Sequence, residues 1–168
     1  MLKPGDIVTQ KKTMINKVNF NDNKENRLSI VLFSYLDKNN GLYYCTVPIT
    51  NATRGVHSKL ISPNHVYMPS AILSTTKLCC AKIDSIYLYK DEIINSTGLS
   101  LEKNLLYKIY DKVLRLEVDE VQKELYDFIK IMINDIIAKE KNELKKVYKE
   151  KQKLKKLKRK ELKRNYKK

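Results

Sequence analysis

Two residues, Arg27 and Thr50, have the side-chain types that suit a phosphodiester. The guanidinium of arginine offers a planar fork of donors and keeps its charge at any working pH. A hydroxyl beside it can donate to a phosphate oxygen or position a ribose hydroxyl. A purely structural role is also open, because many strands begin with a solvated arginine and end in threonine. Residue type and spacing alone therefore leave both a catalytic and a structural role for the pair.

Two predicted strands and the turn between them would bring the pair together. Residues 29–35 form an almost continuous apolar run, and residues 42–49 are rich in Tyr, Val, Thr and Ile, which favour a pleated surface. Residues 37–41 contain the Asn and Gly that tolerate a positive φ in hairpin turns. In an antiparallel hairpin the start of the first strand lies beside the end of the second. Arg27 and Thr50 are therefore expected to meet at its open end.

Short motifs in and around this hairpin resemble the MazF/PemK family of toxin endoribonucleases. They are Gly-Asp-Ile-Val at residues 5–8, Arg27 before an apolar strand, Val-Pro-Ile-Thr at residues 47–50, and a run at residues 78–86 that is similar to a later core strand of the family. Leu28 stands where the family usually has proline, and Asn51 where it often has serine. The motifs keep the family's order over roughly residues 3–116.

The resemblance implies a fold and a chemistry. The fold is α+β, a small SH3-like, mostly antiparallel β-barrel followed by helices, and the sequence adds a long basic C-terminal helix. The chemistry is cleavage of single-stranded RNA, without metal or other cofactor, by attack of a ribose 2′-OH on the adjacent phosphate. Arg27 would stabilise the extra negative charge, and Thr50 would hold a phosphate oxygen or the 2′-OH. Asn51, Arg54 and His57 are candidate substrate-binding residues. The resemblance also implies a homodimer and an antitoxin partner.

The histidines and cysteines add little independent chemistry. His57 is a candidate for proton transfer because imidazole titrates near neutral pH, although a lone histidine in a strand is more often a surface or packed residue. His65 carries still less weight. Neither histidine has an acidic or cysteine companion at metal-ligand spacing, so no metal is expected. Cys45, Cys79 and Cys80 are expected to be reduced packing residues in strands.

The charge of the chain is concentrated near its C-terminus. The sequence has 168 residues and a formal net charge of +15. Residues 139–168 contain 16 Lys or Arg and 4 Asp or Glu, a net charge of +12 that leaves +3 for the rest. No apolar run approaches the length that spans a bilayer, and the N-terminal residues have no apolar signal region. A cytoplasmic location is therefore expected.

Length and periodicity predict one domain with an extension. Residues 1–117 are expected to form the barrel domain with its C-terminal helix, and residues 118–168 a helical extension ending in the lysine-rich tail. A first helix is predicted from Ser100, with a cap-like hydroxyl, and a second from near Asp119. The other expectations are a strand over residues 77–89 that breaks near residues 84–85, and a linker over residues 95–100.

Several alternatives to this interpretation stay open. A ToxN/AbiQ-type ribonuclease has a similar barrel with helices beyond the core and is held by an RNA antitoxin. A non-catalytic barrel that binds nucleic acid through its basic tail is favoured by Leu28 in place of proline and by the lack of a second placed arginine. The tail itself suits RNA, an anionic membrane surface or an acidic protein partner.

Overall fold

The structure is a computed structural model that describes residues 1–10, 28–51, 64–69 and 79–165. The chain separates into two compact units, Met1–Lys130 and Ile131–Lys168. The first unit contains the strands, a short helix and the beginning of a long helix. The predicted division between residues 117 and 118 stays a prediction.

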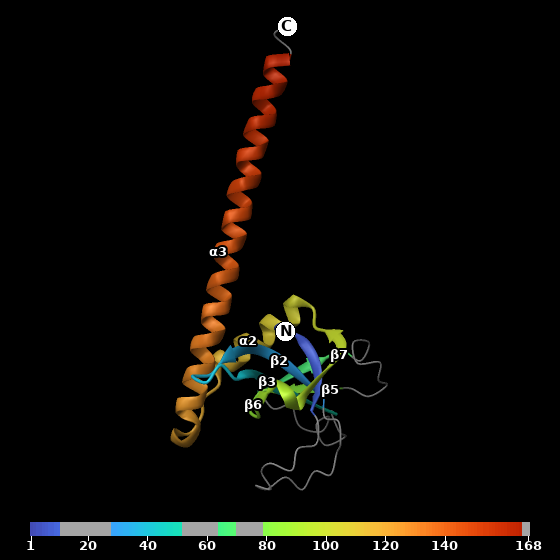
Figure 1. The fold of residues 1–168 in the computed structure, drawn as a ribbon, viewed down its shortest axis with the longest axis vertical. Helices are drawn as coiled ribbons and strands as arrows, with labels where there is room; N and C mark the ends of the chain where they lie inside the picture. The colour runs from blue at the N-terminus through green and yellow to red at the C-terminus, as the bar shows by residue number, and fades with distance from the viewer. Residues whose placement is uncertain (11–27, 52–63, 70–78, 166–168) are drawn as a thin grey trace. The chain divides into compact units, whose positions relative to one another are not determined.

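The first unit is built on a mostly antiparallel sheet, to which the described residues contribute 7 strands (Figure 1). The strands are β1 (Asp6–Gln10), β2 (Leu28–Leu36), β3 (Leu42–Asn51), β4 (His65–Met68), β5 (Cys79–Lys82), β6 (Tyr87–Lys90) and β7 (Ile94–Ser100). Their order is β4-β5-β3-β2-β1-β7, and β6 pairs with β3. Two α-helices, α2 (Lys103–Arg115) and α3 (Glu120–Asn165), follow the strands, so the predicted α+β class is confirmed.

The predicted hairpin is confirmed as β2 and β3. Their pairing runs from Leu36↔Leu42 at the turn to Ser29↔Pro48 near the open end. Asn40 adopts the positive φ expected of the turn, at 59°. Gly41 has a different role, because a Cβ at this position would lie 3.1 Å from Oδ1 of Asp37. This glycine is needed for close approach to the aspartate and not for its backbone conformation.

Asp37 holds the hairpin turn closed from inside. Its Oδ1 accepts hydrogen bonds from the backbone N–H of Asn39, at 2.9 Å, and of Gly41, at 2.6 Å. Replacing Asp37 by alanine is expected to lower the free energy of unfolding by about 1–2 kcal/mol, because both amides lose their acceptor. Asp37→Asn, which keeps a side-chain carbonyl, is the control and should lose less. Urea unfolding measures both variants, and equal stability of the two would rule out this role.

The predicted closed barrel is wrong for the described residues, which form an open sheet. Closure would require a ladder between the two end strands, β4 and β7, and no such ladder joins them in the part of the chain that the structure describes. β4 has 4 residues and pairs with β5, while β7 pairs with β1. Among the described strands, β4, β6 and β7 are each paired on one side only, so the sheet has open edges.

The predicted break near Asp84 and Ser85 is confirmed. It explains how β3 can pair with both β5 and β6 along the same side. The first half of β3 pairs with β6, from Tyr43↔Lys90 to Thr46↔Tyr87. Its last three residues pair with β5, ending at Asn51↔Cys79. Pro48 lies between the two paired stretches, where a residue without an N–H group interrupts neither ladder. The turn between β5 and β6 lets consecutive strands occupy successive lengths of β3.

Residues 94–100 correct two predictions. They were expected to be a linker followed by a serine cap, but they form β7, which pairs with β1. The hydroxyl of Thr97 donates to the backbone oxygen of Ile7 at 2.6 Å, which fixes β7 on this edge. Ser100 ends the strand, and α2 begins three residues later behind Glu102, which makes no side-chain cap hydrogen bond.

Helix α2 and the first turns of α3 cover the sheet in the first unit (Figure 1). Tyr110 of α2 is buried, and its hydroxyl donates to the backbone oxygen of Leu32 at 2.7 Å. Phe128 of α3 packs edge-on against Phe33, with ring centroids 6.1 Å apart. The start of α3 next to Asp119 is confirmed, since Oδ1 of this residue accepts the N–H of Gln122 at 3.0 Å. Among the described helices, none is both long and apolar enough to cross a membrane.

Candidate functional site

The structure places part of the predicted site. Thr50 lies near the end of β3 and is half-buried, and Asn51 is the last residue of that strand. Arg27, Arg54 and His57 lie outside the described residues. The geometry of the site is therefore built from Thr50 outward.

Thr50 shares one face of the sheet with four chemically capable side chains. Thr50 pairs with Cys80 of β5, and Cys80 pairs with Tyr67 of β4. Two residues along, Lys82 of β5 pairs with His65 of β4. Directly paired residues point to the same side, and so do residues two apart along a strand. We call this set, Thr50, His65, Tyr67, Cys80 and Lys82, the Thr50 face.

The Thr50 face is the accessible side of these three strands. The neighbouring residues along each strand point to the other side of the sheet, where they are buried in the core; they are Ile49, Val66, Met68, Cys79 and Ala81. On the Thr50 face, by contrast, Tyr67 is 44% exposed and the Lys82 side chain is also 44% exposed. Cys80, on the same face, is only 1% exposed, so a ligand can reach this side of the sheet at Tyr67 and Lys82.

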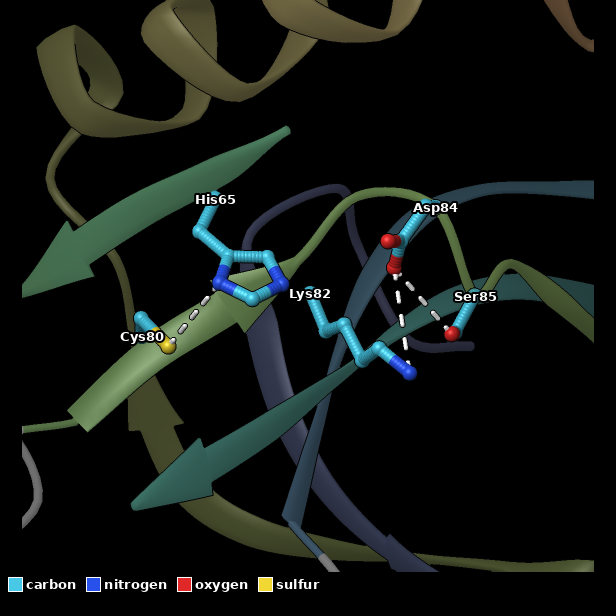
Figure 2. Close-up of polar contacts among 5 residues, drawn as sticks. All are labelled: His65, Cys80, Lys82, Asp84 and Ser85. Carbon is cyan, nitrogen blue, oxygen red and sulfur yellow. Dashed lines mark hydrogen bonds and ion pairs between the residues drawn. The ribbon is translucent and has the colours of Figure 1, made fainter. Parts of the chain in front are cut away.

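His65 lies on β4, the end strand of the described sheet next to β5. Figure 2 shows its ring directed toward Cys80, with Nδ1 at 3.9 Å from the sulfur. Its other ring nitrogen, Nε2, is buried and has no hydrogen-bond partner in the part of the chain that the structure describes. An unsatisfied buried polar atom costs on the order of 1–3 kcal/mol. A ligand atom that reached Nε2 would recover part of this energy.

Cys80 and His65 do not form a nucleophilic pair. Burial raises the pKa of the Cys80 thiol, and the nearby Cys79 and Asp84 raise it further. A cysteine nucleophile acts as a thiolate, which requires the opposite shift. Cys45 is more deeply buried, and desolvation raises the pKa of its thiol as well. The cysteines are therefore packing residues, as the sequence predicts.

This assignment makes a prediction about thiol reactivity. The three cysteines are free and buried, so the folded protein is expected to react with a disulfide reagent at about pH 8 at least ~100-fold more slowly than free cysteine. All three thiols should react in denaturant, which serves as the control. Absorbance after addition of the reagent measures the rate. Fast reaction of a thiol that peptide mapping assigns to Cys80 would show that the Cys80–His65 pair is activated.

Lys82 supplies the positive charge of the Thr50 face. Its ammonium lies 3.9 Å from Oδ1 of Asp84, and the hydroxyl of Ser85 donates to the same oxygen at 3.3 Å (Figure 2). Both members of the ion pair are more than a third exposed, and surface pairs of this kind hold their partners weakly. An incoming phosphate can therefore compete with Asp84 for the lysine.

A concave region elsewhere in the first unit does not suit RNA. A hollow of about 370 Å³ lies at the hairpin turn, with Tyr43 and Lys90 among its lining residues. Its wall also carries the carboxylates of Asp37, Asp91 and Glu92. Three carboxylates repel a phosphate, and Asp37 is already engaged by the turn. This leaves the Thr50 face as the better candidate site.

Sequence reasoning gave little weight to His65 and did not single out Lys82 as a candidate site residue. The alternation of polar and apolar residues in β4 marks one face of that strand, which was a usable signal, whereas β5 has three buried residues in a row before Lys82. The missing information was the register between these strands, because it depends on a pairing between distant segments.

Comparisons with known proteins add no family assignment. Neither the protein-family models nor the curated proteins give a match to this chain. Among the described residues, no three His, Cys, Asp or Glu side chains are grouped so that they could hold a metal ion. The interpretation of the site therefore rests on the chemistry of the Thr50 face and on the short motifs quoted above.

Proposed function

We propose that this protein is a toxin endoribonuclease of a toxin–antitoxin pair, which cleaves single-stranded RNA without metal by attack of a ribose 2′-OH. One observation carries the proposal: Thr50 lies near the open end of the hairpin, on an accessible face that also carries His65 and Lys82. A hydroxyl, an imidazole and an ammonium on one face suit binding of a phosphodiester and transfer of the proton of the attacking 2′-OH. The choice of Arg27 and Thr50 themselves comes from the MazF/PemK resemblance and from their residue types.

Arg27 is the proposed stabiliser of the transition state. It directly precedes Leu28, the first residue of β2, and Ser29 of the same strand pairs with Pro48, two residues before Thr50. This register supports the predicted approach of Arg27 to Thr50 at the mouth of the hairpin. Its guanidinium would bind the scissile phosphate and stabilise the extra negative charge that develops on it.

The remaining steps are assigned to the Thr50 face. The Thr50 hydroxyl donates to a phosphate oxygen or positions the 2′-OH, and Lys82 neutralises charge on the phosphate. His65 is assigned the transfer of the 2′-OH proton or of a proton to the leaving 5′-oxygen, and its ring must turn outward to do so, because Nε2 is buried. The products are a 2′,3′-cyclic phosphate and a free 5′-OH. Asn51, Arg54 and His57 remain the proposed contacts to the rest of the RNA.

Cleavage of a long single-stranded RNA in excess EDTA tests the proposal, with DNA of the same sequence as the matched control. Discrete RNA fragments and intact DNA are expected, because only RNA carries the 2′-OH nucleophile. Absence of RNA cleavage, or equal cleavage of the DNA, would reject the proposed chemistry. The homodimer and the antitoxin that the resemblance implies, and the expected cytoplasmic location, belong to this proposal as well.

A non-catalytic nucleic-acid-binding protein is the second candidate function. The lysine-rich part of α3 favours it, because phosphate contacts alone give affinity without chemistry. Salt-sensitive RNA binding by a protein that cuts no RNA would select this function. Within the ribonucleases, copurification of a small RNA instead of a small protein would select the ToxN/AbiQ type.

A further inference from the structure

The part of α3 that follows residue 140 is the most highly charged surface that the structure describes. Residues 141–159 contain ten Lys or Arg and two Glu, a net charge of +8. All of these residues are exposed, and they belong to a single continuous helix. Their spacing along the helix therefore determines which charges act together.

Four lysines of this segment share an arc of the helix that holds neither an acidic nor an apolar side chain. At about 100° per residue, Lys145, Lys149, Lys153 and Lys156 fall within an arc of about 80°. We call these four residues the basic face. At a rise of about 1.5 Å per residue, the basic face extends over about 16 Å. Outside this arc lie the exposed Leu144, Val147, Leu154 and Leu157, both Glu143 and Glu150, and the remaining cations, of which Lys151, Lys155 and Lys158 are on the opposite side.

Lysine at these positions suits phosphate better than a protein surface. Protein interfaces are depleted in lysine and rely on aromatic and apolar anchors, which the 80° arc does not contain. The lysine ammonium is a flexible point charge, which suits the irregular path of a single-stranded backbone. A membrane fits less well, because Glu143 and Glu150 lie among the apolar residues that would enter the lipid.

We propose that the basic face of α3 binds the phosphate backbone of single-stranded RNA without reading its bases. The inference rests on the proposed function only in taking RNA as the ligand, and it adds a binding surface outside the Thr50 face. Each ammonium that neutralises a phosphate releases a counterion, so the affinity of the basic face falls with salt. The same contacts are available to single-stranded DNA, so this surface adds affinity and not selectivity for RNA.

Two full-length variants test the basic face against total charge. In the first, Lys145, Lys149, Lys153 and Lys156 are each changed to Gln. In the matched control, Lys141, Lys151, Lys155 and Lys158 are each changed to Gln, which removes the same charge from other positions on the same helix. Circular dichroism checks that both variants keep their helix.

The probe is a fluorescein-labelled 2′-O-methyl RNA of about 20 nucleotides, which cannot undergo attack by a 2′-OH. Fluorescence anisotropy gives the Kd between about 50 and 200 mM KCl. The basic-face variant is expected to bind at least ~10-fold more weakly than the control variant. The slope of log affinity against log salt concentration should also be smaller in magnitude by about 3, because four phosphate contacts are lost and each contributes about 0.7 on a single strand. Equal Kd values for the two variants would overturn the proposal. Tighter binding of wild type to phosphatidylserine vesicles than to RNA would also overturn it.

The outcome separates this inference from the proposed function. If wild type binds the probe through the basic face but cuts no RNA, the ribonuclease proposal fails and the binding surface stands. If wild type cuts RNA but the two variants bind alike, the binding surface fails and the ribonuclease proposal stands.

Discussion

Replacing Thr50 by valine is expected to lower kcat/KM for RNA cleavage by about 100-fold or more. Valine keeps the branched shape that suits β3 but removes the hydroxyl that would hold the phosphate or the 2′-OH. Because Thr50 is half-buried and lies near the strand end, the fold should persist. Single-turnover cleavage of RNA measures the effect.

Thr46 provides a matched control in the same strand. It is fully buried, and its hydroxyl has no hydrogen-bond partner in the part of the chain that the structure describes. Thr46→Val therefore removes the same group without removing a described contact, and cleavage should be unchanged. Equal rates for Thr50→Val and wild type would mean that the Thr50 hydroxyl has no role in the reaction.

Replacing Tyr110 by alanine is expected to lower the free energy of unfolding by about 3–5 kcal/mol. The substitution empties a buried aromatic site between α2 and the sheet and removes the hydrogen bond to the backbone oxygen of Leu32. Tyr110→Phe keeps the ring and should cost about 1–2 kcal/mol, the penalty of a buried acceptor that loses its donor. Urea unfolding monitored by circular dichroism measures both.

Tyr148 is the control for this prediction, since it is a tyrosine on an exposed part of α3. Tyr148→Ala should change stability by less than about 0.5 kcal/mol. If Tyr110→Ala and Tyr148→Ala proved equally stable, the contact between α2 and β2 would not be what holds this helix on the sheet.

Local sequence signals predicted the parts of the fold that local chemistry determines. The turn at residues 37–41 forms because Asp37 accepts amides within four residues and Asn40 tolerates a positive φ. The break at Asp84 and Ser85 and the start of α3 next to Asp119 are also short-range features. In each case the residues whose types predicted the feature are the same residues that form it.

Parts of the fold that depend on distant pairing were not predicted. β7 is mostly exposed and has few apolar residues of its own, so nothing within it indicates a strand. It forms because β1 offers an edge and Thr97 bonds to Ile7, which is 90 residues away in the chain. The open sheet has the same origin, since no local pattern reports whether β4 and β7 meet.

The candidate site also combines features that local sequence predicts with features that depend on pairing between distant segments. The sequence placed Thr50 at the open end of a hairpin, because both strands and the turn lie within one short segment. It did not place His65 and Lys82 beside that position, because their alignment depends on the β4–β5 register. Arg27, Arg54 and His57 stay predictions.

Chemical analysis of the RNA ends tests the central claim most directly. Wild type and Arg27→Ala, matched in circular dichroism, are incubated with a long single-stranded RNA in EDTA, and the fragments are analysed by mass spectrometry. The account predicts 2′,3′-cyclic phosphate and 5′-OH ends from wild type, and at least ~100-fold less product from Arg27→Ala. Fragments with 5′-phosphate ends, or equal cleavage by both proteins, would contradict 2′-OH attack assisted by Arg27.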